Sequence, residues 1–571
     1  MKTLNEDCRS RILSEDYTDL MIKYEDALNN IIGEQNNCYD LLNPATAVVY
    51  TPIATLPKNF IHLYGYGAIP NCYGLLDIAS TEASGVRRVR NIPNLNLQGQ
   101  GVLIGIVDTG IEYTHDAFKK ADGTSKILSI WDQTIESEAS RPEGFNYGTE
   151  YTQFQINLAL ASADPLSVVP SVDENGHGTY LAGIAAGTSS QENKFTGVVP
   201  DAEIVVVKLK PAKKFIREFF VIPQDVTCFQ KNDLMHGINY LVNVAKKVMK
   251  PLSLCIGIGT SQGGHDERGA LSTYLSTLAA QSGMAVVIAA GNEGNSGHHY
   301  YGTADKKIKY NTVELKVGPN EPGFSMELWG TAFNTFSIDL LSPSGEYIPR
   351  IPARIGETRE IRFIFEKTII NIDYQLLESQ SGDELILVRI KNPSEGIWRF
   401  RVYVGGDLTL NYHIWLPITQ FLNNETYFTE PDPEYTLTSP GNTFVPIVVT
   451  AYDHTNDSLY NNASRGYTRN NNIAPIIAAP GVNVIGPALN NGYKTASGSS
   501  VAAAHTAGIT AMFLEWGIVR GNYTQINSVE IKNLLIRGAK RNPGITYPNK
   551  EWGYGILDIY NSFNSLRGEN L

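Results

Sequence analysis

The order of apolar and polar residues divides the chain into parts with different secondary structure. Residues 1–67 combine a stretch with helical apolar spacing, SEDYTDLMIKYEDALNNII, with a short run that is typical of a strand, VVYTPIATL. From residue 68 to 302, continuous apolar runs such as GVLIGIVD and AEIVVVKLK alternate with amphipathic helical segments. This alternation predicts a parallel sheet covered by helices on both faces. We therefore expect a small α/β unit followed by an α/β domain.

A different pattern occupies residues 303–437. Segments such as SMELWG, EIRFIFE and WRFRVYV have period-2 or short apolar patterns, with turn residues between them and no long helix. This spacing predicts an antiparallel β domain of the jelly-roll type, inserted into the α/β domain. The parallel pattern returns over residues 438–571, with FVPIVVTAYD and IIAAPG. The expected fold class is α/β with a β insert.

Composition and charge narrow the classes of protein. Of the 571 residues, 42% are hydrophobic and 18% are charged, which is typical of a globular chain. The formal net charge of −12 supplies no basic field for nucleic acid or anionic lipid. No apolar run reaches the length of a membrane span, and the charged N-terminus lacks the apolar core of a secretory signal. We expect a protein that is made in the cytoplasm and is not exported by the Sec route.

The cysteines are few, scattered and odd in number, and no CxxC pair occurs: Cys8, Cys38, Cys72, Cys228 and Cys255. We expect neither a disulfide framework nor a zinc site. Acidic loops such as SADPLSVVPSVDEN lack the spacing of an EF-hand, and such loops are more often simply solvated. Calcium would be the metal to consider, but the sequence offers no cage for it, and no cofactor is expected.

Three polar residues lie at strand ends or helix starts, where α/β folds place their catalytic side chains. Asp108 ends a buried strand in VDTG, His177 lies in DENGHGTYLAG, and Ser500 lies in SGSSVAAAHTAG at the start of a small-residue helix. Each alone has an ordinary explanation, as a turn residue, a loop histidine or a helix cap. Together they supply a serine nucleophile, a base that takes its proton and a carboxylate that orients the base.

These motifs resemble those of the subtilisin-like serine proteases. VDTGI resembles the Asp motif of that family, NGHGTYLAG its His motif and SGSSVAAAHTAG its Ser motif. AAGNEG resembles the oxyanion motif and points to Asn292, while SRG and AAPGV match two further signatures. The resemblance covers about residues 68–300 and 438–565. It implies Asp108, His177 and Ser500 as the catalytic triad, with the Asn292 side chain and the Ser500 backbone N–H as oxyanion donors.

The resemblance also implies where substrate binds. PLSLCIGIG aligns with the strand that lines the primary specificity pocket, which assigns substrate binding to Leu254, Cys255, Ile256 and Gly257. Peptide would then be bound by strand addition along this edge. An ordinary core strand explains Leu254 and Ile256 equally well.

Members of this family generally carry an N-terminal prodomain whose tail lies in the active site and is cut there. Here residues 1–67 would be the prodomain, 68–302 and 438–571 the catalytic domain, and 303–437 the insert. HLYGYG resembles the prodomain tail, so we expect self-cleavage within Tyr64, Gly65, Tyr66, Gly67 and Ala68, after Tyr66 or Gly67. A plain interdomain linker is the alternative.

A short prodomain, a complete triad and a β-rich insert together resemble the clostridial Csp germination proteases. The resemblance implies a serine endopeptidase that is incorporated into the spore, keeps its prodomain bound and removes the propeptide from the zymogen of a cortex hydrolase. Two alternatives stay open: a non-catalytic binding protein that senses germinants, and a general intracellular protease. The presence of Asp108, His177, Asn292 and Ser500 favours an enzyme, because a pseudoenzyme has no need to keep all four.

Overall fold

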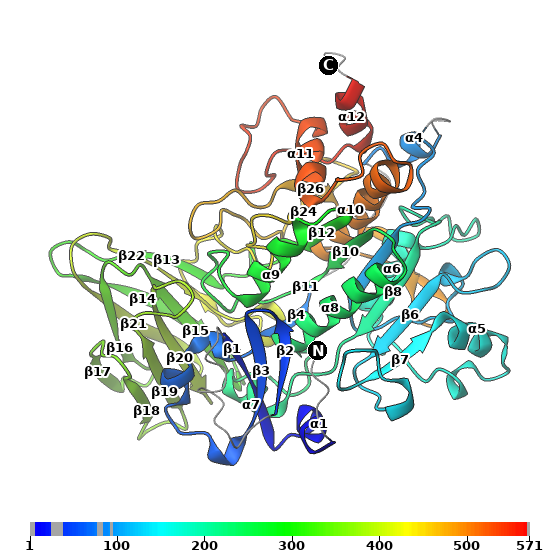
Figure 1. Cartoon of the computed structure of the whole chain (residues 1–571). Helices are drawn as coiled ribbons and strands as arrows, with labels where there is room; N and C mark the ends of the chain where they lie inside the picture. Colours follow the sequence, from blue (N-terminus) through cyan, green and yellow to red (C-terminus); the bar gives the residue numbers. More distant parts are fainter. Residues whose placement is uncertain (1–5, 24–37, 77–83, 92–94, 568–571) are drawn as a thin grey trace.

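The computed structural model of the chain describes residues 6–23, 38–76, 84–91 and 95–567. It has an N-terminal unit that runs to residue 76, an α/β domain, and a β insert whose strands lie between His299 and Phe428. Figure 1 shows the insert to one side of the α/β domain, with the N-terminal sheet against α8 and beside the insert.

The α/β domain is built on one sheet with the strand order β25-β24-β12-β10-β5-β8-β6-β7, and β26 pairs with β24. Neighbouring strands are parallel except for β6 with β7 and β24 with β25. The strands are β5 (Leu103–Asp108), β6 (Ile127–Asp132), β7 (Thr149–Thr152), β8 (Glu203–Lys208), β10 (Leu252–Ile256), β12 (Met284–Ala289), β24 (Ile447–Asp453), β25 (Ser458–Leu459) and β26 (Ile477–Pro480). The expected parallel sheet flanked by helices is confirmed.

Side chains of the sheet alternate between two cores, because successive residues of a strand point to opposite faces. In β5, Ile104 and Ile106 join one core, while Leu103 and Val107 join the other. The first core is covered by α6 (His177–Ala186), α10 (Ser499–Leu514) and α11 (Ser528–Gly538), and the second by α8 (Lys231–Lys247) and α9 (Ala270–Ala279). Burial on both faces explains the continuous apolar runs of these strands.

The insert is a sandwich of two antiparallel sheets around a separate apolar core. The first sheet contains, in spatial order, β13 (His299–Thr303), β22 (Asn411–Trp415), β15 (Gly323–Gly330), β20 (Glu384–Lys391), β19 (Ile369–Gln375) and β18 (Thr358–Arg362). The second contains β17 (Tyr347–Ile351), β16 (Thr335–Leu341), β21 (Gly396–Gly405), β14 (Tyr310–Val317) and β23 (Tyr427–Phe428). The insert thus begins with β13, slightly before residue 303, and its classification as a jelly roll stays a prediction.

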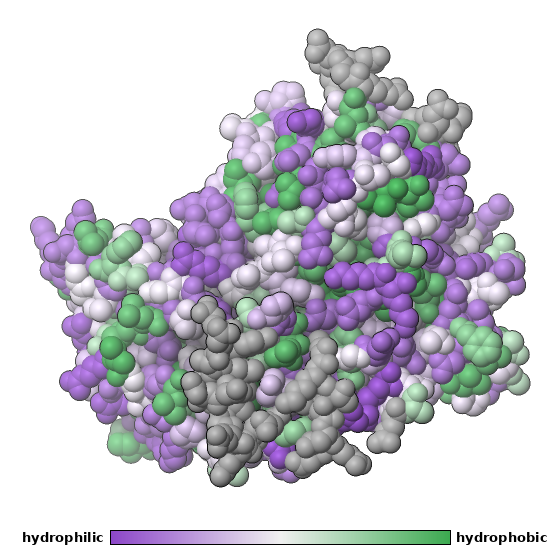
Figure 2. Space-filling view, viewed as in Figure 1, coloured by the Kyte–Doolittle hydropathy of each residue, from purple (hydrophilic) through white to green (hydrophobic). Residues whose placement is uncertain are grey.

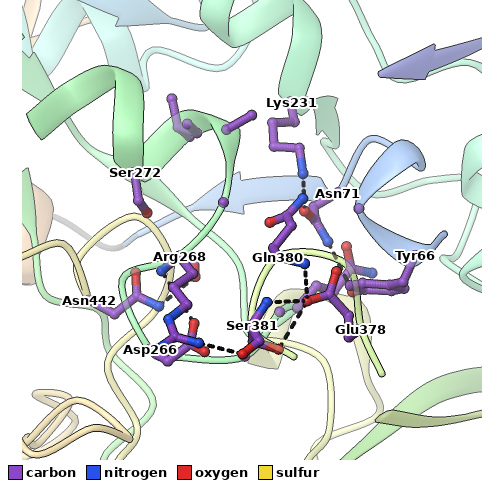
Figure 3. Close-up of a pocket in the computed structure, with 18 of the residues that line it drawn as sticks. Tyr66, Asn71, Lys231, Asp266, Arg268, Ser272, Glu378, Gln380, Ser381 and Asn442 are labelled. Atoms are coloured by element: carbon purple, nitrogen blue, oxygen red, sulfur yellow. Dashed lines mark hydrogen bonds between the residues drawn. The ribbon is translucent and has the colours of Figure 1, made fainter. Parts of the chain in front are cut away.

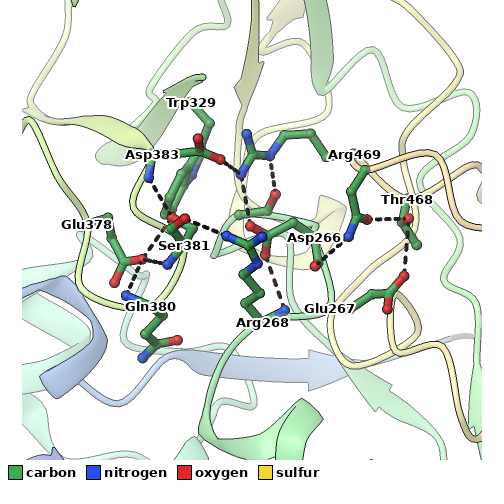
Figure 4. A network of polar contacts seen from close by, with 12 residues as sticks. Asp266, Glu267, Arg268, Trp329, Glu378, Gln380, Ser381, Asp383, Thr468 and Arg469 are labelled. Carbon is green, nitrogen blue, oxygen red and sulfur yellow. Dashed lines mark hydrogen bonds and ion pairs between the residues drawn. The ribbon is translucent and has the colours of Figure 1, made fainter. Parts of the chain in front are cut away.

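A buried arginine joins the insert to the α/β domain (Figure 4). The Arg469 guanidinium donates to Asp266 at 2.9 Å and to Asp383 of the insert at 2.6 Å. Its Nε donates to the backbone oxygen of Gly264 at 2.6 Å, and the group lies over the ring of Trp329. Because the guanidinium offers a rigid fork of donors, one side chain can satisfy acceptors from both parts and hold them in register.

The N-terminal unit is a three-stranded antiparallel sheet with the order β1-β3-β2, preceded by a short helix. The helix is α1 (Glu6–Leu13) and the strands are β1 (Tyr17–Lys23), β2 (Tyr39–Asn43) and β3 (Thr46–Pro52). The unit continues through α3 (Phe60–Tyr64) to β4 (Cys72–Leu75). Met21, Val48 and Tyr50 share an apolar core with Leu234 and Ile238 of α8. The sheet therefore completes the cover over α8, as Figure 1 shows.

Two expectations for the N-terminal unit are corrected. The stretch from Ser14 that has helical spacing contains β1, whose residues pair with β3 from Tyr17↔Pro52 to Lys23↔Thr46. Residues 24–32 of the stretch lie outside the described residues. Cys8 and Cys38 form one disulfide, although the sequence predicts no disulfide framework. An odd count of cysteines does not exclude one pair, and Cys72, Cys228 and Cys255 are free and buried.

The surface carries hydrophobic residues in small separate groups among hydrophilic ones on the face shown in Figure 2. Within the described part of the chain, no helix combines the length and the hydropathy that crossing a membrane requires.

Candidate active site

Asp108 and His177 meet where β5 ends and α6 begins. Asp108 is the last residue of β5 and is fully buried, and His177 is the first residue of α6. A Cβ on Gly178 would overlap the backbone oxygen of Gly110, so glycine lets the helix start directly against the strand end. His177 Nδ1 lies 2.7 Å from Asp108 Oδ1.

A second carboxylate holds the start of this helix. Asp173 Oδ1 accepts from the backbone N–H of Gly176 at 2.8 Å, and its Oδ2 accepts from the N–H and hydroxyl of Thr179 at 3.0 and 2.7 Å. Carboxylates favour helix N-termini because they satisfy otherwise unpaired N–H groups there. Asp173 thereby orients the helix that carries His177, which explains part of the acidic loop that had been considered for calcium.

Ser500 lies in the first turn of α10, which follows Gly498 at φ 153°. Every residue of this helix is buried, and its first turns are almost entirely Ser, Ala and Thr. Small side chains allow the helix to pass close to α6 and to β10, β12 and β24, with which it packs. The sequence pattern therefore places a hydroxyl at a helix N-terminus inside the domain, where the helix dipole favours developing negative charge.

The hydroxyl of Ser500 and the imidazole of His177 contact one common atom, the carbonyl oxygen of Leu76. Ser500 Oγ donates to Leu76 O at 2.5 Å, and His177 Nε2 lies 2.7 Å from the same oxygen. Both ring nitrogens of His177 thus face oxygen acceptors. Burial by itself lowers the pKa of His177, but the charge of Asp108, its hydrogen bond and the contact with Leu76 outweigh burial and raise the pKa above 6.5.

Asn292 supplies an amide donor beside this carbonyl. Its Oδ1 accepts from the backbone N–H of Ser499 at 3.0 Å, while its Nδ2 is buried without a hydrogen-bond partner. Asn292 lines a cavity of about 360 Å³ together with Leu76 and His177. Unpaired buried donors are rare because they cost free energy, and an oxyanion would complete this one.

The loop that carries Asn292 is fixed by two serines. Ser499 Oγ accepts from the N–H of Gly291 at 3.1 Å, and Ser464 Oγ accepts from the N–H of Glu293 at 2.9 Å. Ser464 belongs to the SRG signature, so this motif contributes by holding the loop. The Asn292 amide is thus positioned before any substrate charge develops.

Leu76 is presented by a peptide that lies in the cleft as an extra strand. β4 (Cys72–Leu75) pairs antiparallel with β11 (Ile258–Gly259) on one side and with β9 (Phe229–Gln230) on the other. Strand addition of this kind binds a peptide through its backbone. The bond that follows Leu76 is therefore the one that the nucleophile faces.

The structure corrects the substrate-binding residues that were predicted. Leu254, Cys255 and Ile256 belong to β10, which pairs with β5 and β12 and so has no free edge for a peptide. All three are buried in the core. The peptide pairs with Ile258–Gly259, after the chain has left the central sheet. Of the predicted set, only Gly257 is near the reacting groups: a Cβ there would lie 3.2 Å from Ser500 Cβ and 3.4 Å from His177 Cε1.

The predicted self-cleavage segment is also corrected. Tyr64 ends α3 (Phe60–Tyr64), and Tyr66, Gly67 and Ala68 form a short 3₁₀ turn. Gly65 adopts φ 81° as the residue after the helix, which is a common position for glycine. The YGYG pattern therefore reflects a helix end and a turn rather than an extended peptide.

Residues around Tyr66 form a joint between all three parts (Figure 3). Tyr66 is buried, its hydroxyl donates to Glu327 of the insert, and Asn71 Nδ2 donates to the same hydroxyl at 3.0 Å. Lys231 of α8 donates to Asn71 Oδ1 at 2.6 Å. Tyr66 is thus fixed to the insert while Leu76 contacts Ser500, and the N-terminal unit continues to Leu76 rather than ending at residue 67.

Sequence reasoning missed β4 and a segment of the insert that contacts it. Gln420 Oε1 accepts from the backbone N–H of Leu75 at 3.0 Å. Ile418, Thr419 and Gln420 also line the cavity beside Asn292. The run CYGLL before the α/β domain has the apolar character of a bound strand, but nothing local to the sequence pairs it with segments 150 or more residues away. For metals, the described residues contain no group of three or more His, Cys, Asp or Glu side chains suited to an ion.

Comparisons with known proteins agree with this arrangement. The model of the subtilase family matches residues 99–314 and 423–555. The chain is 22% identical over 536 residues to the PII-type proteinase of Lacticaseibacillus paracasei, covering 83% of this chain and 26% of that protein. It is 22% identical over 492 residues to the minor extracellular protease Vpr of Bacillus subtilis, covering 83% and 52%. The chain therefore spans about a quarter to a half of the length of these relatives.

One solved structure matches this chain over almost the whole length of the solved protein. The CspB protease of Clostridium perfringens superposes with a TM-score of 0.76 and 31% sequence identity, covering 86% of this chain and 97% of that one. The residues that the family model leaves unmatched, 315–422, lie within the β insert. With its family motifs gathered around one carbonyl and more than half of its length matched, the chain belongs to the subtilase family.

Proposed function

We propose that the chain is a serine endopeptidase that cuts its own backbone after Leu76 and then activates a protein zymogen by limited proteolysis. The observation that carries this proposal is the shared contact of Ser500 Oγ and His177 Nε2 with the carbonyl oxygen of Leu76. A binding protein without catalysis would not need a nucleophile, a base and an unpaired amide donor around one peptide carbonyl.

The reaction follows from the positions of these groups. Ser500 Oγ attacks the carbonyl carbon of Leu76 while His177 takes the hydroxyl proton, and Asp108 stabilises the resulting imidazolium. The Asn292 amide and the Ser500 backbone N–H donate to the oxyanion. His177 then gives its proton to the leaving amine of Asp77, and water attacks the acyl-serine by the reverse sequence of proton transfers, which releases the Leu76 carboxylate.

The N-terminal unit is proposed to stay bound after this cut. Asp19 of β1 is fully buried and accepts from Lys213 at 2.6 Å, Gln230 at 2.7 Å and Asn232 at 2.8 Å, all from the α/β domain. Asn146 donates to Asp40 of β2 at 2.6 Å. Separating the two parts would leave these buried charged and polar groups without their partners. This supports a complex in which the N-terminal unit stays bound after the peptide bond is cut.

The physiological substrate is proposed by similarity to the CspB protease. A clostridial germination protease would remove the propeptide from a spore cortex hydrolase precursor, and a spore protein of that kind would be kept in the spore rather than exported. The β insert and the N-terminal unit both border the cleft here, which supports limited proteolysis of a chosen segment over general degradation.

Intact-mass measurement of the purified chain beside the Ser500→Ala and His177→Ala variants tests the activity. We expect the unsubstituted chain to give a fragment ending at Leu76 and a complementary fragment beginning at Asp77, with both variants whole. If the unsubstituted chain also stays whole, the binding-protein function takes precedence. Incubating the cleaved protein with a purified cortex hydrolase precursor and sequencing the new N-terminus then tests the zymogen step.

A further inference from the structure

A short segment of the β insert closes over the peptide in the cleft. We name Ile418–Phe421 the cleft wall; its last three residues form a 3₁₀ turn. A Cβ built on Gly74 would lie 2.6 Å from Ile418 Cδ1, 2.9 Å from Gln420 Oε1 and 3.2 Å from Phe421 Cζ. Gly74 has no unusual φ, so the requirement for glycine there is one of space rather than of backbone conformation.

The cleft wall is held so that it cannot easily retreat. Ile418 and Phe421 are 2% and 1% exposed and pack in one core with Trp329 and Trp415 of the insert. Glu293, the neighbour of Asn292, accepts from the N–H and the hydroxyl of Thr419, each at 3.0 Å. Close-packed side chains that must move to admit an extra carbon cost about 1–3 kcal/mol.

The strand that pairs with Gly74 is also closely packed. Gly74 pairs with Gly259 of β11, where a Cβ would meet Thr438 Oγ1 at 2.6 Å and Leu76 Cδ1 at 3.3 Å. Thr438 follows β23, the last strand of the insert, so a residue outside the cleft wall also packs against the strand that pairs with the peptide. Thr438 and Leu76 thus leave no space for a side chain at Gly259, the residue that pairs with Gly74.

Backbone recognition accompanies this steric selection. Gln420 accepts from the N–H of Leu75, the residue between Gly74 and the cut bond. β11 and β9 bind the peptide on both edges, and the cleft wall covers it from a third direction. Only an extended segment whose third residue before the cut lacks a side chain can pair with β11 and β9 and also fit beneath the cleft wall.

Taking the proposed protease function as given, we propose that the cleft wall is a specificity subsite that admits glycine at the third residue before the cut bond. Its substrates are then extended segments with glycine at that position, as in residues 73–76 of this chain. The insert acts as a specificity element, with Ile418 and Phe421 excluding side chains and Gln420 holding the backbone.

The subsite is tested by measuring the rate of self-cleavage in variants of Gly74 and Ile418, singly and combined. We expect Gly74→Ala to slow cleavage about tenfold and Gly74→Val about a hundredfold, because the added carbons meet the cleft wall. Beside Ile418→Ala, which removes the nearest atom, the slowing caused by Gly74→Val should fall below about tenfold. Equal slowing in both backgrounds, or none, overturns the subsite, and melting temperatures identify any variant that fails to fold.

A readout without catalysis separates this proposal from the protease function. In a Ser500→Ala background, hydrogen exchange of the Leu75 amide reports whether the peptide is seated against Gln420. We expect Gly74→Val to accelerate this exchange and Ile418→Ala to restore protection. If the unsubstituted chain stays whole while exchange follows this pattern, the protease function is contradicted and the subsite is supported. If Gly74→Val leaves the exchange of the Leu75 amide unchanged, the subsite is rejected, even when the unsubstituted chain cleaves itself normally.

Discussion

The carboxylate of Asp19 and the ammonium of Lys213 lie 2.6 Å apart, both buried, on opposite sides of the boundary between the N-terminal unit and the α/β domain. Gln230, whose side chain also contacts Asp19, belongs to β9 and pairs with the peptide strand β4. The contacts that bind the N-terminal unit thus adjoin the edge that binds the peptide.

We expect Asp19→Ala to release the N-terminal fragment after self-cleavage. The change takes the charged acceptor away from Lys213, Gln230 and Asn232, which keep only their weaker contacts. Removing one partner of a buried ion pair costs about 3–5 kcal/mol. Size-exclusion chromatography of the cleaved protein measures whether both fragments elute together. Asp16→Ala, an exposed carboxylate of the same unit, is the control, and co-elution of the Asp19 variant would contradict the expectation.

Asn292→Asp removes the oxyanion donor and keeps the shape of the side chain. The new carboxylate still accepts from the Ser499 N–H, so the loop keeps its anchor while the developing oxyanion loses its amide partner. We expect self-cleavage to slow by at least about 10²–10³-fold. The rate is read by quantifying the fragment that ends at Leu76 over time. A rate near that of the unsubstituted chain, with an unchanged melting temperature, would show that Asn292 has no part in catalysis.

The rate of self-cleavage should fall as the pH decreases through the pKa of His177. Only neutral His177 can accept the Ser500 proton, and contacts with Asp108 and Leu76 raise the pKa of His177 above 6.5. The rate is therefore full above that pKa and is lost on acidification, beginning at a higher pH than for an unperturbed histidine. Time courses of the refolded chain between about pH 5 and 9 measure this profile. A rate that stays constant down to about pH 5.5 contradicts it.

Glu384 should make the chain less stable as the pH rises from about 4.5 to about 8. It is 1% exposed, its Oε1 has no hydrogen-bond partner, and burial raises the pKa of its carboxyl to about 8 from 4.5. Between these values the folded chain binds more protons than the unfolded one, so the free energy of unfolding falls as the pH rises through this window, by at most about 5 kcal/mol.

Glu384→Gln tests this linkage, because glutamine keeps an acceptor for the Phe336 N–H and carries no charge. We expect the melting temperature of the variant to exceed that of the unsubstituted chain by an amount that grows from about pH 5 to pH 9. Glu395→Gln, an exposed carboxylate of the insert, should show no such growth. A constant difference between the Glu384 variant and the parent would mean that this carboxyl is not protonated in the folded chain.

The sequence predicted those elements whose pattern is local. β5, β8, β10 and β12 are continuous apolar runs because each is buried on both faces, and the period of the pattern is enough to identify them. The sheet flanked by helices and the family are confirmed, and Asp108, His177 and Ser500 come together as their motifs implied.

What the sequence missed depends on partners far along the chain. β4 is a strand only because β9 and β11 lie on either side of it. β1 is a strand, despite its helical spacing, because it pairs with β3. The peptide binds at Ile258–Gly259 rather than at Leu254–Gly257, because an edge is free only where the chain has left the central sheet. Motif alignment locates a strand but does not show which of its residues lacks a neighbour.

The strand β4 and the cleft that binds it belong to one chain. The rate of the proposed first cut should therefore not depend on protein concentration. After the proposed cut, the Leu76 end would stay tethered to a unit that Asp19 and Asp40 anchor, and would compete for the cleft at an effective concentration of about millimolar, as short tethers give. A second protein would gain access at the rate at which this end lifts away. The turnover of the mature enzyme would then be limited by local opening of a five-residue end, without dissociation of the whole N-terminal unit.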